Sequence, residues 1–104
     1  MEEREKVLAG LRADIDALDV EIVGLMAQRM ALVDRVIMVK REHNLPARIH
    51  SRVEEVARLV GEHAVKAGIS PDYTETVWRA MMDWVIAYED RQLSKRGFDD
   101  GVGR

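Results

Sequence analysis

The sequence lacks cysteine and holds few proline, glycine or aromatic residues. Without cysteine the chain can form no disulfide, no thiolate metal cluster and no cysteine nucleophile. Pro46 and Pro71 are its two prolines, and no segment keeps the apolar–polar alternation that is typical of strands. No apolar run is long enough to cross a membrane, and the charged start does not resemble a secretion signal. These absences predict a soluble, cytoplasmic, all-α protein.

Length and charge exclude further classes of protein. The 104 residues suffice for one domain, which we expect over residues 1–96, followed by a flexible C-terminal tail at 97–104. A formal net charge of −3 argues against a nucleic-acid partner. His43, His50 and His63 do not have the spacing of a metal site, so no metal is predicted.

The first part of the chain has a heptad pattern. Apolar residues recur with gaps of three and four and include Arg29 in the same series: Leu8, Leu11, Ile15, Leu18, Ile22, Leu25, Arg29, Leu32, Val36 and Val39. This pattern predicts a helix from near Glu3 to near His43, roughly 60 Å long, that packs lengthwise on a partner. About sixty further residues cannot cover such a rod, so we expect a second copy of the chain to cover it.

Two shorter helices are expected after a loop at about 44–50. Ser51 and Glu54 have the spacing of a capping box, which predicts a helix from Ser51 to near Ala67, with Gly68 in the left-handed conformation after it. Ser70 as N-cap and Pro71 at the first helical position predict a third helix that ends near Lys95.

Three charged residues lie on faces that are otherwise apolar. Arg29 belongs to the heptad series, Lys40 lies eleven residues later on the same face, and Glu89 follows Trp78, Met82 and Val85 at helical spacing. Burial of an unpaired charge is costly, so each needs a partner. Either Glu89 pairs with Arg29 or Lys40 and nothing else binds, or the cations hold an anionic ligand. Two cations and one acid on inward faces favour the ligand site.

Four segments carry a resemblance to a known family: LRADIDALD at 11–19, LMAQRM at 25–30, VK at 39–40 and RV at 52–53. Together they resemble the all-α (type II) chorismate mutases, a family that includes the isochorismate-pyruvate lyases. The resemblance spans about Leu8 to Arg91. It implies an intertwined homodimer with two shared active sites, and a place in aromatic amino acid biosynthesis through the shikimate pathway.

The resemblance also implies roles for individual residues. Arg12 would reach into the partner chain's site and bind a substrate carboxylate, and Arg29 would bind the other carboxylate. Lys40 would contact the ether oxygen and a carboxylate, and Arg52 would hold the upper part of the site. The implied catalytic residues are Arg29, Lys40 and Glu89, and the implied substrate-binding residues are Arg12, Arg29, Lys40, Arg52, Val53, Val85 and Glu89.

The implied reaction is the Claisen rearrangement of chorismate to prephenate. Because this rearrangement is concerted, it needs no nucleophile, metal or cofactor, and none is predicted. The protein must hold the dianion in its reactive conformer and stabilise charge on the ether oxygen. Glu89 stands where many bacterial members have glutamine. It can replace that hydrogen-bond donor only as a carboxylic acid.

Two departures leave the substrate open. Val53 stands where bacterial mutases usually have a glutamate that accepts a hydrogen bond from the C4 hydroxyl, and Ile49 replaces an aspartate common in the preceding loop. The alternatives are an isochorismate-pyruvate lyase, which forms salicylate, or a 4-amino-4-deoxychorismate mutase. A helical dimerisation module without catalytic activity is the alternative outside the enzymes.

Overall fold

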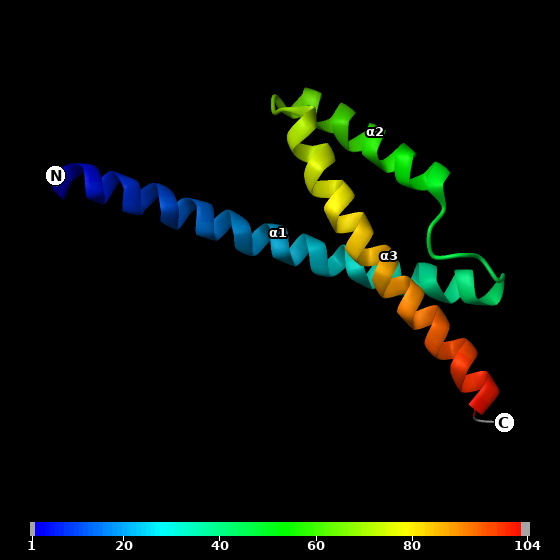
Figure 1. Cartoon of the computed structure of the whole chain (residues 1–104). Coiled ribbons are helices and arrows are strands. Elements are labelled where there is room, and N and C mark those ends of the chain that lie inside the picture. The colour runs from blue at the N-terminus through cyan, green and yellow to red at the C-terminus, as the bar shows by residue number, and fades with distance from the viewer. Residues whose placement is uncertain (1, 103–104) are drawn as a thin grey trace. The chain divides into compact units, whose positions relative to one another are not determined.

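The residues that the structure describes form three helices. The structure, a computed structural model, describes the backbone of residues 2–102 and the side chains of residues 2–95. The helices are α1 (Glu2–Glu42), α2 (His50–Ala67) and α3 (Pro71–Val102) (Figure 1). The predicted all-α class with one long first helix is therefore confirmed. The chain divides into two compact units, residues 1–34 and 35–104, and α1 runs from the first into the second.

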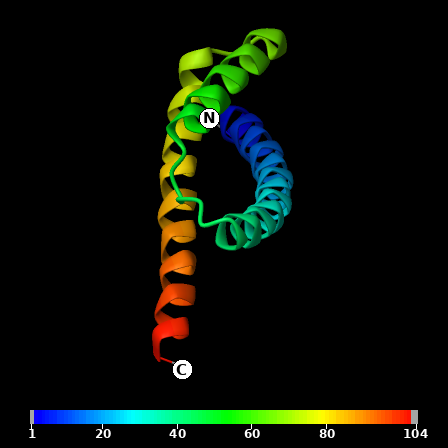
Figure 2. The same ribbon diagram turned by 90° about the vertical axis from the view of Figure 1, so that its right-hand side faces the viewer.

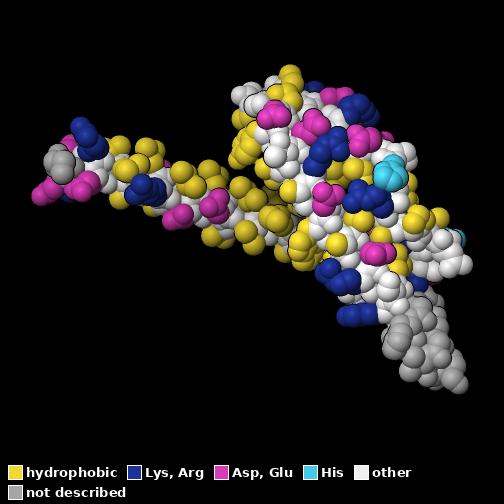
Figure 3. All heavy atoms as spheres, viewed as in Figure 1, with side chains coloured by type: hydrophobic (Ala, Val, Ile, Leu, Met, Phe, Trp, Pro, Cys, Tyr) yellow, Lys and Arg dark blue, Asp and Glu magenta, His cyan; other side chains and the backbone are white. Residues whose placement is uncertain are grey.

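The first unit is the long N-terminal part of α1. Its first turn carries Glu2, Glu3 and Glu5, whose negative charge suits the positive end of the helix. The apolar side chains of the heptad series are exposed in the single chain, with Leu18 57%, Leu25 62% and Leu32 57% accessible. Figure 3 shows apolar side chains along α1. Such a length of exposed apolar surface marks an interaction site, and its cover by a second copy stays a prediction.

The end of α1 depends on a residue with a positive φ angle. Asn44 has a φ of 55°, in the left-handed region that asparagine tolerates better than most residues. The N–H of Leu45 then donates to the carbonyl of Lys40 at 2.8 Å, which closes the last turn. The chain can therefore leave the helix directly after the turn that carries Lys40.

The predicted capping box at the start of α2 is wrong. Ile49 is the N-cap residue, with φ −118° and ψ 102°, and no side chain caps the helix. Its carbonyl accepts the N–H groups of Arg52 and Val53 at 3.0 and 3.1 Å. Ser51 consequently lies inside the first turn, and Glu54 binds Arg79 of α3 instead of the helix start. The N-cap lies two residues before Ser51, too early for the box to form.

The predicted end of α2 and start of α3 are confirmed. Gly68 has a φ of 78°, a left-handed conformation that costs glycine little, and its N–H donates to the carbonyl of Val65. The third helix begins at Pro71, and the carbonyl of Ser70 accepts the N–H groups of Tyr73 and Thr74. Pro71 suits this position because its missing N–H would have no partner there.

The predicted end of α3 near Lys95 is wrong, because the helix continues to Val102. A glycine inside a helix costs about 1 kcal/mol relative to alanine, so Gly97 and Gly101 weaken the helix without ending it, and no proline follows them. Flexibility of residues 97–104 stays a prediction, and 103–104 lie outside the described residues.

In the second unit, α2 and α3 run antiparallel and pack on each other (Figures 1 and 2). The hydroxyl of Thr74 also donates to the carbonyl of Val60 at 3.1 Å. The buried residues of α2 are Ala57, Val60 and Ala64, and those of α3 are Met82, Val85 and Glu89. Each set follows the spacing i, i+3, i+7 of one helix face. Among the helices of the described residues, none is long and apolar enough to cross a membrane.

Candidate active site

Lys40 of α1 and Glu89 of α3 form a nearly buried ion pair. The Nζ atom of Lys40 lies 2.6 Å from Oε1 of Glu89, and the side chains are 12% and 7% accessible. The same Nζ donates to the main-chain carbonyl of Ala47 at 2.7 Å. The carbonyl of Ala47 and the carboxylate of Glu89 therefore hold one ammonium group, whose position is more fixed than that of a lysine on the surface.

The apolar stripe of α3 positions Glu89. Met82 and Val85 are buried, and Glu89 is the next residue on the same face, one turn after Val85. A carboxylate is tolerated there because Lys40 neutralises it. The predicted inward position of Glu89 is confirmed, and of its two expected partners the structure shows Lys40. This pairing does not decide whether a ligand also binds.

The structure does not add Arg52 to this pair. The guanidinium of Arg52 binds Glu55 of its own helix at 2.8 Å, and both side chains are exposed. Val53, the next residue, is half-buried. Val85 is buried one turn before Glu89. Thus the α3 residues expected at the site lie on one face, whereas Arg52 is occupied elsewhere.

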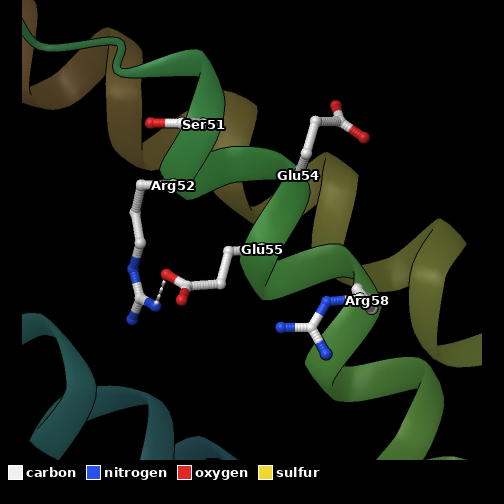
Figure 4. A pocket seen from close by; sticks show the side chains of 5 residues that line it. All are labelled: Ser51, Arg52, Glu54, Glu55 and Arg58. Carbon is white, nitrogen blue, oxygen red and sulfur yellow. Dashed lines mark hydrogen bonds and ion pairs between the residues drawn. The ribbon is translucent and has the colours of Figure 1, made fainter.

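Arg52 lines an open depression on the surface of α2, with a volume of about 490 Å³. The five residues drawn in Figure 4 line it: Ser51, Arg52, Glu54, Glu55 and Arg58. In this view Arg52 and Glu55 reach toward each other, while Glu54 points away from them. Neither Lys40 nor Glu89 belongs to the depression. Its mixed charges partly neutralise one another, so it is a weak candidate for an anion site.

Arg12 and Arg29 belong to the first unit of α1. The side chain of Arg12 is exposed in the single chain, and that of Arg29 is half-buried. Both lie on the helix that carries Lys40. Their expected contacts with a ligand stay a prediction.

Two contacts of the site have no signal in the sequence. The carbonyl of Ala47 binds Lys40, and the guanidinium of Arg41 donates through Nη2 to the carbonyl of Gln92 at 2.8 Å. Both acceptors are main-chain atoms, which every residue has, so no side-chain pattern marks them. Asn44 and Pro46, with turn propensities, could have indicated that the loop folds back.

Arg79 of α3 connects α2 to α3 through two carboxylates. Its Nη1 and Nη2 atoms donate to both oxygens of Glu54 at 3.1 and 2.9 Å, and its Nε atom donates to Glu75 at 3.1 Å. Hydrogen bonds from Arg79, together with its charge, lower the pKa of Glu54 below its ordinary value. The two carboxylates raise the pKa of Arg79. These groups are exposed, so the network is screened by water.

The similarity to known proteins covers the segment that holds the expected site residues. The family model for chorismate mutase type II matches residues 11–90. The T-protein of Haemophilus influenzae is 41% identical over 88 residues, which cover 83% of this chain and 23% of that protein. The T-protein of Enterobacter agglomerans is 33% identical over 75 residues, 72% of this chain and 20% of that protein.

A shorter relative is also similar. The 4-amino-4-deoxychorismate mutase of Streptomyces pristinaespiralis is 26% identical over 90 residues, which cover 86% of this chain and 70% of that protein. The matched segment thus spans less than a quarter of the two T-proteins but most of this mutase.

Proposed function

The chain belongs to the chorismate mutase type II family, and we propose that it catalyses the Claisen rearrangement of chorismate to prephenate in the cytoplasm, without a cofactor. The observation that carries this proposal is the family match over residues 11–90, and the Lys40–Glu89 pair agrees with it, because the pair holds an ammonium in a nearly dry environment between helices. A cation excluded from water stabilises developing negative charge more strongly than one in bulk solvent.

The reaction needs the protein only to position the substrate and to supply charged groups. In the rearrangement a carbon–oxygen bond breaks while a carbon–carbon bond forms within one molecule, so no atom enters or leaves. Lys40 would donate to the ether oxygen, and Arg29 would bind a carboxylate. Glu89 would donate to the ether oxygen when protonated, and Val85 would shape the apolar wall one turn away. Holding the dianion in its folded conformer supplies the rest of the acceleration.

We propose that the active protein is an intertwined homodimer with two shared sites. The exposed heptad residues of α1 support this, because a free helix with leucines accessible to more than half of their surface would aggregate. In the dimer, Arg12 would enter the partner's site and bind the second carboxylate, while Arg52 would exchange Glu55 for substrate. We expect no folded monomer in sedimentation at micromolar concentration. A compact helical monomer at that concentration would contradict the proposed role of Arg12 in the partner's site.

A second substrate is favoured by the residues at the start of α2. Ile49 is the N-cap and Val53 is half-buried, so neither offers an acceptor for a C4 hydroxyl. The similarity to a 4-amino-4-deoxychorismate mutase agrees with a site that does not require this hydroxyl. Isochorismate, whose conversion gives salicylate and pyruvate, fits the same reasoning.

One experiment separates these alternatives. Purified protein receives chorismate, isochorismate or 4-amino-4-deoxychorismate separately, and the products are identified by mass spectrometry. Prephenate from chorismate at the highest kcat/KM supports the proposal, while salicylate with pyruvate, or preference for the amino compound, replaces it with that activity. A helical module without activity would turn over none of the three and would show no melting shift with them.

A further inference from the structure

Arg41 connects α1 to α3 one turn beyond the Lys40–Glu89 pair. Its Nη2 atom donates to the main-chain carbonyl of Gln92 at 2.8 Å. Lys40 and Arg41 are consecutive in α1, while Glu89 and Gln92 are three residues apart in α3. The two helices are therefore connected twice, at adjacent positions of one and successive turns of the other.

The two connections differ in what they fix. An ammonium on a flexible four-carbon stem can follow a moving carboxylate, so the Lys40–Glu89 pair alone leaves the helices free to slide or rotate slightly. Arg41 binds the backbone of α3 rather than a side chain, and the planar guanidinium limits the direction of that bond. Consecutive residues diverge by about 100° around a helix. Contacts from both Lys40 and Arg41 thus resist rotation as well as translation.

Arg41 holds this contact at a cost. The side chain is half-buried, and its Nε atom has almost no accessible surface and no hydrogen-bond partner over the described part of the chain. A buried donor without a partner destabilises a fold, and such a group in a native structure requires an explanation. Stability alone does not explain it, because a long apolar side chain would fill the same space without the penalty.

We propose that Arg41 is a positioning residue, which fixes α3 at Gln92 so that Glu89 and Lys40 meet in the arrangement that the reaction needs. For turnover this rests on the proposed function. Displacement by about 1 Å can cost a reaction 100-fold. A guanidinium that holds the backbone one turn from Glu89 therefore affects the rate without touching substrate.

The first test measures thermal unfolding and needs no activity. Arg41→Met is made in the wild-type and Glu89→Gln backgrounds, and the melting temperatures of all four proteins are compared at one protein concentration. If Arg41 supports the pair, the decrease in Tm caused by Arg41→Met is about 4 °C smaller in the Glu89→Gln background than in the wild-type background. The matched control is Gln92→Ala, which keeps the carbonyl acceptor, so there the effect of Arg41→Met stays unchanged. Equal effects in the wild-type and Glu89→Gln backgrounds overturn the proposal.

The second test measures kinetics with whichever substrate the protein converts. We expect Arg41→Met to lower kcat about 10- to 100-fold with little change in KM, because a positioning defect acts on the transition state. Arg41→Lys keeps a donor for Gln92 and should recover part of kcat. The control is Arg48→Met, which removes an exposed ion pair with Asp83 and should leave kcat unchanged. Equal kcat in Arg41→Met and Arg48→Met overturns the proposal.

The two tests separate the failure of this inference from the failure of the proposed function. If the wild-type protein converts none of the three substrates, the proposed activity is wrong, and the melting comparison still decides the role of Arg41. If Arg41→Met does not fold, Arg41→Gln replaces it in both tests, since it keeps a shorter donor.

Discussion

Lys40 and Glu89 lie 49 positions apart in the chain, yet their charged atoms approach to 2.6 Å with both side chains nearly buried. Each charged group is shielded from water and is paired with the other charged group. Loss of one partner therefore leaves the remaining charge in an apolar surrounding without compensation, whereas loss of both leaves none. The stability of the second unit thus depends on the pair as a unit.

A double substitution tests this dependence. We expect Lys40→Met alone to lower the free energy of unfolding by about 3 kcal/mol, since Glu89 is then unpaired. Lys40→Met combined with Glu89→Leu should recover most of that loss, because two apolar side chains can pack in the same space. Urea denaturation at fixed protein concentration measures both. If the double variant loses as much as Lys40→Met alone, or more, the pair does not act as a unit.

The pH dependence of turnover tests the role of Glu89. As a carboxylate Glu89 accepts a hydrogen bond from Lys40, and it can donate to an ether oxygen only when protonated. We expect kcat of the wild type to fall as pH rises, because only the carboxylic acid can donate. Glu89→Gln keeps a donor at every pH, so its kcat should stay level from about pH 4.5 to about pH 9. An equal alkaline fall in both proteins would show that Glu89 only balances Lys40.

Arg29 tests ligand binding in the heptad series. We expect Arg29→Ala to lower kcat/KM by about three orders of magnitude, because a charged contact to the transition state is lost. The free energy of unfolding should change little or rise, since an arginine among apolar residues carries a desolvation cost. Steady-state kinetics and urea denaturation are measured on the same preparation. A variant that unfolds while the wild type converts no substrate would make Arg29 a structural residue.

The proposed dimer interface is tested on two exposed positions of α1. Leu18 is 57% exposed and belongs to the heptad series, while Val20 is 73% exposed and lies outside it. Two residues correspond to about 200° around a helix, so the two side chains face nearly opposite directions. We expect Leu18→Asp to abolish the dimer in analytical ultracentrifugation and Val20→Asp to preserve it. Equal effects of both substitutions would contradict a heptad interface.

Glu54 contributes to stability in a pH-dependent way. Because hydrogen bonds from Arg79 lower its pKa in the folded chain, the folded state favours the ionised form. This contribution is complete above the ordinary pKa of glutamate and is lost as pH falls through the lowered pKa of the folded chain. The Tm of the wild type should therefore be higher than that of Glu54→Gln at about pH 7, and this difference in Tm should vanish at about pH 2.

The contribution of the Glu54–Arg79 pair is also tested by added salt and by a control variant. The Glu54–Arg79 pair is exposed, so about 0.5 M salt should reduce the difference in Tm at neutral pH. Glu62→Gln serves as control, because it removes a pair with Arg58 inside α2 rather than a connection between α2 and α3. A larger effect from Glu62→Gln would mean that the connection to α3 adds nothing.

The helices were predictable from the sequence because their signals are local. The heptad spacing, Gly68 and Pro71 each mark a backbone conformation that few alternatives satisfy. Ser51 and Glu54 misled for a physical reason: a carboxylate at that spacing can cap its own helix or bind another one, and Arg79 lies 25 positions away in the chain. The end of α3 was expected too early, near Lys95, although Gly97 and Gly101 weaken the helix without ending it.

The site was predictable in part. Lys40 and Glu89 stand out as charges on apolar faces, but which cation meets Glu89 depends on how the helices pack. The contacts of Lys40 with Ala47 and of Arg41 with Gln92 use main-chain acceptors and leave no trace in residue types. The proposed exchange of Arg52 from Glu55 to a ligand would be a competition between two partners, which no spacing can decide.

The two contacts of Lys40 also limit the direction from which a ligand oxygen can reach its nitrogen. An ammonium has three N–H bonds, and Ala47 and Glu89 accept two of them. The third has no acceptor among the residues that the structure describes, so an incoming oxygen can approach the nitrogen along one direction while the other two bonds persist. This contact fixes the place of one ligand oxygen but not the handedness of the ligand, because a molecule and its mirror image can each be turned to bring an oxygen there. Selection of one enantiomer therefore needs contacts from other residues at other points of the same ligand.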